Sequence, residues 1–246
     1  ECANLREVYI PESVVEIGVN IFEKKCYDIL RKINNDQKTP IVATGRTDKK
    51  VHALCQYAHA DLDVNITEYK LKRALNSNLP DDIHVISTKI VDNNFHARYM
   101  VKEKEYQYIL NTKEYNPLER NYVFQYNKEL DIKLMQEAIK FFLGEHSFKS
   151  FTPTKDAKEN CVRTINYVNI EDNNGKIIFT FRGTGFIKYQ IRNMVGVALA
   201  IASKNEDLDY IPYHLKEDKV REIVVRKDDD NVSTVLLHEK LLIAEN

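Results

Sequence analysis

An aspartate stands beside basic residues in a segment that is typical of a turn. Asp48 ends the sequence Gly-Arg-Thr-Asp at residues 45–48, and two lysines follow it. An apolar run at residues 41–43 precedes the segment and an alternating stretch at 51–61 follows it, so we expect a strand on each side. A carboxylate on a turn between rigid strands can be held in place while one side stays open to a substrate.

A purely structural turn explains the same segment. Asp and Thr side chains bond their own backbone, and Gly adopts dihedral angles that other residues avoid. Taken alone, residues 45–48 therefore predict a turn. A chemical role for Asp48 needs support from other parts of the chain.

Composition describes an ordinary globular protein. The chain has 246 residues, of which 43% are hydrophobic and 30% charged, and this fits one large domain or two small ones. No apolar run approaches the roughly 20 residues of a membrane helix, and the first residues do not read as a signal peptide. We therefore expect an intracellular protein with no membrane association, and the cytoplasm, the nucleus and an organelle all stay open.

Cysteine and charge limit the kinds of site. The four cysteines are scattered without a Cys-x-x-Cys pair, so we expect no metal site. Net charge is −1, from 36 basic and 37 acidic residues, which is not the field of a general nucleic-acid binder. Residues 175–204 nevertheless carry only basic charges. A basic face and a surface of mixed charge explain this distribution equally well.

Helical and strand patterns alternate irregularly along the chain. Antiparallel hairpins are expected, above all where Asn174-Gly175 joins two alternating runs. The pattern indicates an α+β protein built on a largely antiparallel sheet. The expected helices cover residues 13–33, 67–79, 132–143, 187–203 and 218–226, and the expected strands cover 83–91, 104–110, 122–126, 163–171, 176–182 and 232–243. Ser13, Thr67 and Asp131 stand at the starts of the first three helices, Gly144 would end the third with a left-handed cap, and residues 145–151 would form a loop.

Two of these elements carry side chains that could bind a substrate. Alternation places Tyr106 and Tyr108 on one face of the strand at 104–110, where an aromatic residue more often packs in the core. Lys188 and Arg192 are four residues apart, so they share one face of the expected helix at 187–203. The Gly-x-Gly before that helix lacks the spacing of a dinucleotide fingerprint.

Taken together, these stretches resemble the TruA-type tRNA pseudouridine synthases. Each match is modest alone, but they occur in the family's order over about residues 13 to 200. The matching stretches are Gly-Arg-Thr-Asp at 45–48 with Val-His-Ala at 51–53, Phe-His-Ala-Arg at 95–98 with Lys104-x-Tyr106-x-Tyr108, Gly-Glu-His-x-Phe at 144–148, Arg-Thr-Ile at 163–165, and Gly183-x-Gly185-Phe186 with Gln-Ile-Arg-Asn-Met-Val-Gly at 190–196.

The resemblance implies roles for individual residues. Asp48 would be the essential carboxylate, Tyr106 would stack on the target uracil, and Arg192 would pair with Asp48. The RNA contacts would come from basic side chains, namely Arg46, Lys49, Lys50, Arg98 and Lys188.

The resemblance also implies a fold and partners. Two α/β halves, residues 1–102 and 103–246, would share a mostly antiparallel central sheet with the catalytic cleft between them, which is the pseudouridine synthase fold. The partner would be tRNA. Bacterial members work as homodimers and some eukaryotic relatives do not, so a homodimer is one assembly that the resemblance allows.

Two departures from the family's pattern bear on these expectations. Lys50 stands where the family usually has Gly, and a positive φ there would cost roughly 1 kcal/mol. The family's usual first-strand signals are absent, so we expect that strand to be missing, through truncation or divergence.

The chemistry implied by the resemblance fits these residue types. Breaking the N1–C1′ bond of uridine and rejoining the base through C5 needs neither redox chemistry nor a cofactor. A carboxylate can stabilise an oxocarbenium-like C1′, as in glycosidases, and an aromatic ring can hold a base that has left the stack. We therefore expect a tRNA pseudouridine synthase, most simply one acting at positions 38–40 of the anticodon stem-loop.

Two other hypotheses remain open. A tRNA-binding protein or tRNA chaperone of the same fold, impaired in catalysis, would account for Lys50, the missing first strand and the neutral net charge. A hydrolase using Asp48 with His52 is a weaker hypothesis, because no nucleophile accompanies them.

Overall fold

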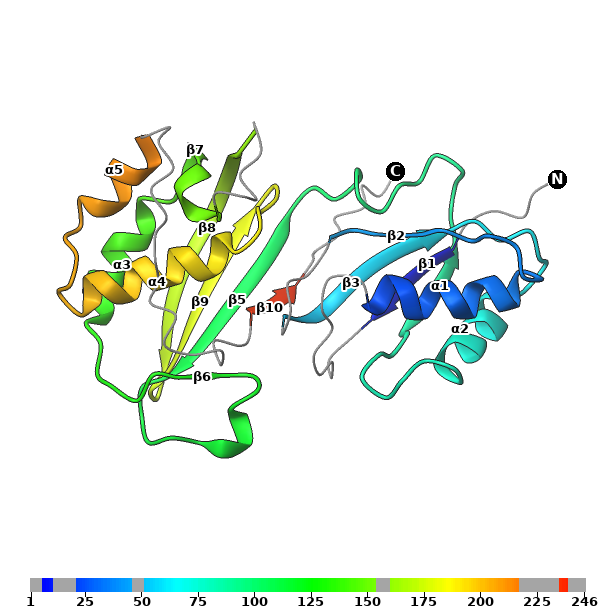
Figure 1. The fold of residues 1–246 in the computed structure, drawn as a ribbon, viewed down its shortest axis with the longest axis horizontal. Helices are drawn as coiled ribbons and strands as arrows, with labels where there is room; N and C mark the ends of the chain where they lie inside the picture. The colour runs from blue at the N-terminus through cyan, green and yellow to red at the C-terminus, as the bar shows by residue number, and fades with distance from the viewer. Residues whose placement is uncertain (1–5, 11–20, 46–50, 154–159, 217–234, 239–246) are drawn as a thin grey trace. The chain divides into compact units, whose positions relative to one another are not determined.

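The computed structural model describes residues 6–10, 21–45, 51–153, 160–216 and 235–238. The chain divides into two compact units. The first comprises residues 1–102 with 237–246, and the second comprises residues 103–236. Each unit combines helices with a mostly antiparallel sheet, which confirms the predicted α+β class (Figure 1). Within the described ranges, no helix is long and apolar enough to cross a bilayer.

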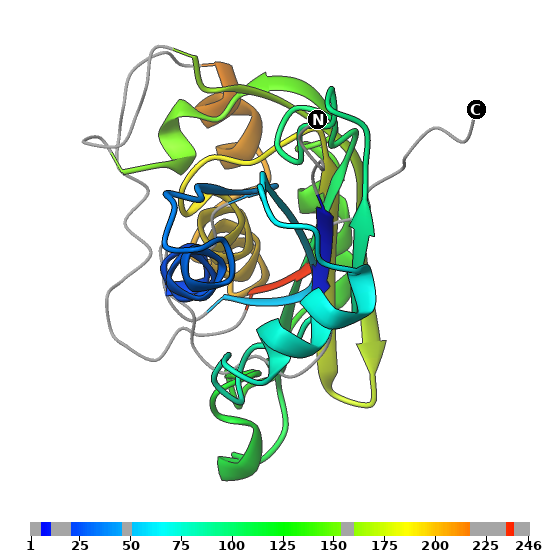
Figure 2. The same cartoon turned by 90° about the vertical axis from the view of Figure 1, so that its right-hand side faces the viewer.

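The first unit is an antiparallel sheet with two helices on one side. Strand β1 lies between β3 and β4, and β2 also pairs with β3. Figure 2 views α1 nearly along its axis, to one side of β1. The elements are β1 (Arg6–Ile10), α1 (Ile21–Ile33), β2 (Ile41–Ala43), β3 (His52–Ala60), α2 (Glu68–Asn76) and β4 (Ser87–Ile90).

The first strand, which we expected from the sequence to be missing, is present as β1. Val8 pairs with Ala58 of β3 on one side and with Thr88 of β4 on the other. The family's usual signals for this strand are short motifs of particular residues. Backbone pairing requires only residues that suit a strand, and the sequence Val-Tyr-Ile at 8–10 meets that requirement.

Both helices of this unit bury apolar faces against the sheet. The Thr67 hydroxyl accepts from the Lys70 N–H and caps α2, as the sequence predicted. The expected cap of the first helix, at Ser13, lies outside the described residues. The core contains Leu30 of α1, Leu71 and Leu75 of α2, and Ala58 and Ala60 of β3. These contacts hold β2 and β3, the two strands on either side of residues 46–50.

The second unit is a four-stranded antiparallel sheet in the order β5-β9-β8-β7. The short β6 runs parallel to the end of β5, and α3 and α4 pack on one face of the sheet (Figure 1). The elements are β5 (Lys104–Asn111), β6 (Phe124–Gln125), α3 (Ile132–Lys140), β7 (Gly144–Ser147), β8 (Val162–Asn173), β9 (Lys176–Gly183), α4 (Gln190–Ala202) and α5 (Tyr210–Lys216), with 3-10 helices at Pro117–Glu119 and Lys149–Phe151. A further strand, β10, spans Val235–His238.

The hairpin between β8 and β9 confirms the strongest local prediction. Asn174 and Gly175 have φ values of 57° and 89°, as a two-residue turn of type I′ requires. Gly144 also has a positive φ, of 98°, but α3 ends four residues earlier at Lys140. Gly144 therefore opens β7 instead of capping the helix, and the loop expected at 145–151 is a strand followed by a 3-10 helix.

Three phenylalanines form a core beneath α4. Phe142 and Phe151 meet edge to face with ring centroids 5.3 Å apart, and Phe148 lies 5.7 Å from Phe151. All three are fully buried. The Asn193 amide of α4 donates to the Phe151 carbonyl (2.8 Å), so this cluster holds the first turn of α4 in place.

Candidate active site

Most of the predicted catalytic segment lies outside the described residues, but the structure describes the residues on either side of it. Arg46, Asp48, Lys49 and Lys50 fall in residues 46–50, which are not described. On the near side, the Thr44 N–H donates to the Tyr57 carbonyl (2.9 Å). On the far side, Val51 and His52 are buried where β3 begins. Residues 46–50 therefore connect two fixed points of the first unit.

Gln56 holds the end of β2, a role that sequence reasoning missed. Its amide Nε2 donates to the Gly45 carbonyl (2.8 Å), directly before residues 46–50. Gln56 is only 8% exposed, although Gln usually lies at the surface. The sequence does carry one sign of this role. Gln56 is a polar residue that alternation places on the same face of β3 as the buried His52 and Ala58.

Tyr106 is half-buried near the start of β5 in the second unit. Its ring meets Phe186 edge to face, with centroids 4.9 Å apart at 75°. Tyr108 and Leu110, farther along the same face of β5, are fully buried. Tyr106 therefore lies where the core face of the strand reaches solvent, which suits a ring that contacts a ligand better than a ring that only packs.

Arg192 lies in the first turn of α4, above the ring of Tyr189. Its guanidinium carbon is 5.5 Å from the ring centroid, and the Lys188 ammonium is 5.3 Å from the same centroid. The helix begins at Gln190, so Lys188 precedes it instead of sharing its face as predicted. Tyr189 still brings the two cations together.

Tyr189 has a backbone conformation that is unusual for an aromatic residue. Its φ is 59°, in the left-handed region, and it occupies the N-cap position of α4. Non-glycine residues in this region carry a cost of about 1–3 kcal/mol and concentrate at functional sites. The sequence gives no local sign of this conformation.

The charge of Arg192 acts on Tyr108 of β5. Burial raises the pKa of the Tyr108 hydroxyl, and the positive charge of Arg192 opposes that shift. Tyr106 and Tyr108 alternate onto the same face of β5, and helix α4, which carries Arg192, packs against this strand. Within the second unit, Tyr106 contacts Phe186, and Arg192 and Lys188 share the ring of Tyr189, three residues farther along the chain.

Arg98 lies in the connector that follows β4 in the first unit, and its side chain is exposed. The preceding residue is fixed, because the Ala97 N–H donates to His59 Nδ1 (3.0 Å). His59 must therefore be unprotonated at Nδ1. Burial lowers the pKa of His59, and the neighbouring His96 lowers it further. Across the described part of the chain, no group of three or more His, Cys, Asp or Glu side chains could hold a metal ion.

A sequence profile of the family described as tRNA pseudouridine synthase matches residues 14–100 and 138–237. The chain belongs to this family. The matched ranges contain Asp48, Arg98 and Arg192, and Tyr106 lies between them.

Curated relatives carry the corresponding names. The tRNA pseudouridine synthase A 1 of Bacillus cereus is 38% identical over 184 residues, which cover 74% of each chain. The tRNA pseudouridine synthase A 2 of Clostridium perfringens is 38% identical over 193 residues, covering 78% of this chain and 79% of its own. The tRNA pseudouridine synthase A of Streptococcus pneumoniae is 40% identical over 191 residues, covering 76% and 77%. These matches confirm the TruA-type family and the isomerase class predicted from the sequence motifs.

Proposed function

We propose that this tRNA pseudouridine synthase isomerises uridines of the anticodon stem-loop, with Asp48 as its essential carboxylate. The observation that carries the proposal is the half-buried Tyr106 on β5, with Tyr108, the next residue on the same face of the strand, under the influence of the Arg192 charge. The sequence match over residues 14–100, which contain Asp48, supports the role of the carboxylate.

The reaction is balanced without a cofactor. The N1–C1′ bond of uridine breaks, the base turns, and a C5–C1′ bond forms. C5 then loses its hydrogen as a proton, and N1 gains a proton. A carboxylate stabilises the positive charge that develops at C1′, or bonds to the substrate, while the base is detached.

Each remaining side chain meets one requirement of this reaction. Tyr106 is half-buried, and its ring would offer a flat surface to the flipped uracil. An Arg192 guanidinium paired with Asp48 would keep that carboxylate ionised. Five basic residues would contact phosphates: Arg46, Lys49, Lys50, Arg98 and Lys188.

Tritium release tests the proposal directly. Excess enzyme is incubated with tRNA that carries tritium at uridine C5, so that a single turnover is sufficient for detection. We expect wild type to release tritium and Asp48→Asn to release none while binding tRNA within a few-fold of wild type. Release by Asp48→Asn at the wild-type rate would exclude the proposed role of Asp48.

A catalytically impaired tRNA-binding protein is the second candidate. The lysine at position 50, where the family usually has glycine, favours it. In that case wild type would bind tRNA in a salt-sensitive manner and release no tritium. Lys50→Gly would then be the variant to test for recovered activity.

A further inference from the structure

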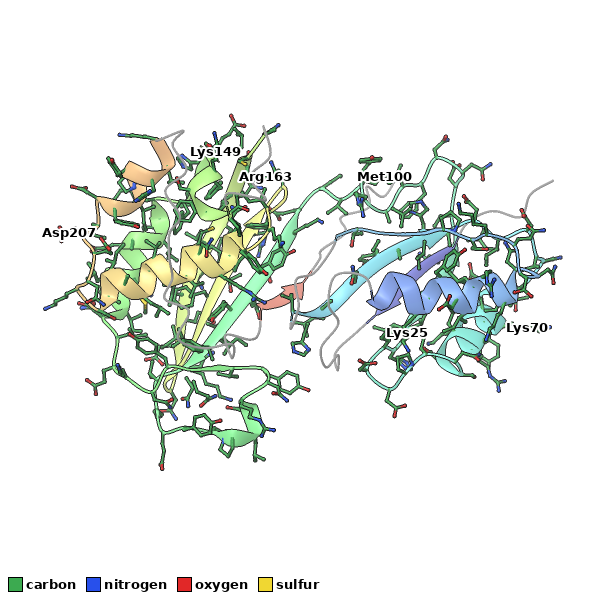
Figure 3. The ribbon with its side chains drawn as sticks, viewed as in Figure 1. Lys25, Lys70, Met100, Lys149, Arg163 and Asp207 are labelled. Carbon is green, nitrogen blue, oxygen red and sulfur yellow. The ribbon has the colours of Figure 1, made fainter. Side chains whose placement is uncertain are left out.

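An exposed aromatic ring stands in the connector after β4, on a backbone that hydrogen bonds hold in place. Tyr99 is 80% exposed. On either side of it, the Ala97 N–H donates to His59 Nδ1 (3.0 Å) and the Met100 N–H donates to the His96 carbonyl (3.0 Å). Figure 3 labels Met100, the residue that follows Tyr99 in this connector.

One face of the Tyr99 ring is already stacked. The His96 imidazole lies 4.1 Å from it, centroid to centroid, at an interplanar angle of 26°. His96 in turn meets the His59 ring at 4.7 Å, and His59 belongs to β3. The stack therefore fixes the orientation of the Tyr99 ring relative to β3. Because Tyr99 is exposed, its ring leaves a flat surface open to a ligand.

The residues around Tyr99 favour RNA over a protein partner. A protein interface usually has an apolar, tightly packed centre, whereas the exposed neighbours of Tyr99 are mainly polar or charged. The exposed residues within seven positions of Tyr99 along the chain are Asp92, Asn93, Asn94, Arg98 and Lys102, with Met100 as the apolar exception. A flat ring with cations beside it matches an unpaired nucleotide, because the base stacks on the ring and the phosphates meet the cations.

We propose that Tyr99 stacks on an unpaired base of the tRNA, a different base from the uridine that Tyr106 would hold. The inference rests on the proposed function, because it names a further part of the same substrate. His96 and His59 act behind Tyr99 as supports that fix the ring before RNA arrives.

The absence of tryptophan from the chain allows a direct optical test. In Tyr99→Trp, the new indole is the only tryptophan and reports stacking through loss of its fluorescence. We expect titration with tRNA to quench this signal strongly. Tyr69→Trp is the matched control, because Tyr69 is another exposed tyrosine of the first unit, 68% exposed on α2. The fluorescence of Tyr69→Trp should change only through the inner-filter effect of the added RNA.

Steady-state kinetics of the Tyr99 variants provide a second, independent test. Tyr99→Ala should raise KM for tRNA roughly tenfold, the usual effect of losing one base–aromatic stack, and leave kcat within about twofold. Tyr99→Phe keeps the ring and should restore the wild-type KM. Tyr69→Ala should change neither constant.

The experiments distinguish a failure of the proposed function from a failure of the stacking proposal. If wild type releases no tritium from labelled tRNA, the proposed function fails, yet quenching of Tyr99→Trp on tRNA binding would still support the stack. If wild type is active but Tyr99→Trp is quenched no more than Tyr69→Trp, the stacking proposal is overturned. An unchanged KM in Tyr99→Ala would overturn it as well.

Discussion

The Arg192 guanidinium lies over the ring of Tyr189, 5.5 Å from its centroid, and Tyr189 has a left-handed backbone with φ of 59°. The ring can occupy this position because the backbone turns there, directly before α4 begins at Gln190. A contact of this kind contributes about 0.5–2 kcal/mol and limits the directions that the guanidinium adopts. Tyr189 therefore helps to aim Arg192.

We predict that Tyr189→Asn separates stability from activity. Asn adopts the left-handed region more readily than Tyr, so thermal stability should be equal or higher. Because the ring is lost, kcat/KM for tRNA should fall roughly tenfold, in line with a lost cation–π contact. Tyr189→Phe keeps the ring and should stay near wild type in tritium release. Parallel losses of activity in Tyr189→Phe and Tyr189→Asn would contradict the role of the ring.

A second prediction concerns the hydrogen bond from Gln56 to the Gly45 carbonyl. Gln56→Met removes the donor at similar size, so the residues before Asp48 lose a fixed point. We expect kcat to fall roughly ten- to hundredfold, the scale of effects from small misplacements of reacting groups. Asn76→Ala is the control, because Asn76 also bonds backbone in the first unit, through Val85. It should lower the unfolding midpoint without a specific loss of kcat.

A third prediction separates two glycines of the Gly-x-Gly segment. A Cβ at Gly183 would meet the Thr164 carbonyl oxygen at 2.4 Å, which is backbone and cannot rotate away. Gly183→Ala should therefore cost about 1–3 kcal/mol in free energy of unfolding. A Cβ at Gly185 would find its nearest neighbour at 4.0 Å, in the Arg163 side chain, so Gly185→Ala should be nearly neutral. Urea unfolding of the two variants checks this, and equal midpoints would refute the packing argument.

A fourth prediction concerns the stability of the first unit at acidic pH. Burial and the charge of His96 lower the pKa of His59 below 6.5, while Asp61 acts in the opposite direction. A lowered pKa means that folding favours neutral His59, so its contribution is complete above 6.5 and is lost as pH falls toward the folded pKa. Protonation of Nδ1 would also break the bond from the Ala97 N–H.

His59→Gln tests this account, because an amide oxygen can accept from Ala97 without titrating. Unfolding midpoints measured from pH 5 to 7.5 should fall less steeply on the acid side for the variant than for wild type. An identical pH dependence in the two proteins would show that His59 does not contribute.

Local signals predicted much of the fold. Thr67 and Asp131 cap α2 and α3 as expected, and Asn174-Gly175 makes the predicted hairpin turn. These features depend on neighbours within a few residues, which a sequence displays directly.

The elements that were missed depend on more distant contacts. β7 has the polar sequence Gly-Glu-His-Ser and becomes a strand by pairing with β8. α5 contains Pro212, which reads as a helix breaker although the first turn of a helix accepts it. Such elements are decided by their tertiary partners, and these cannot be read from the segment itself.

The site shows the same division. The resemblance to the family singled out Tyr106 and Arg192, and their roles stay predictions, although the structure shows that the charge of Arg192 acts on Tyr108 of β5. The supports escaped notice, because neither the left-handed Tyr189 nor the buried Gln56 carries a motif. Whether Asp48 meets Arg192 stays a proposal.

The β8–β9 hairpin has a consequence for the order in which the second unit folds. Its strands are joined by a two-residue turn, so they can meet within microseconds. β5 must instead close a long loop before Lys104 reaches Gly183, and loop closure of that kind is slow. We expect pulse-labelled hydrogen exchange during refolding to show protection of β8 and β9 amides before those of β5. Strand β5, which carries Tyr106, would then pair with a hairpin that has already formed. The ring surface proposed for the uracil would be among the last parts of this unit to fold.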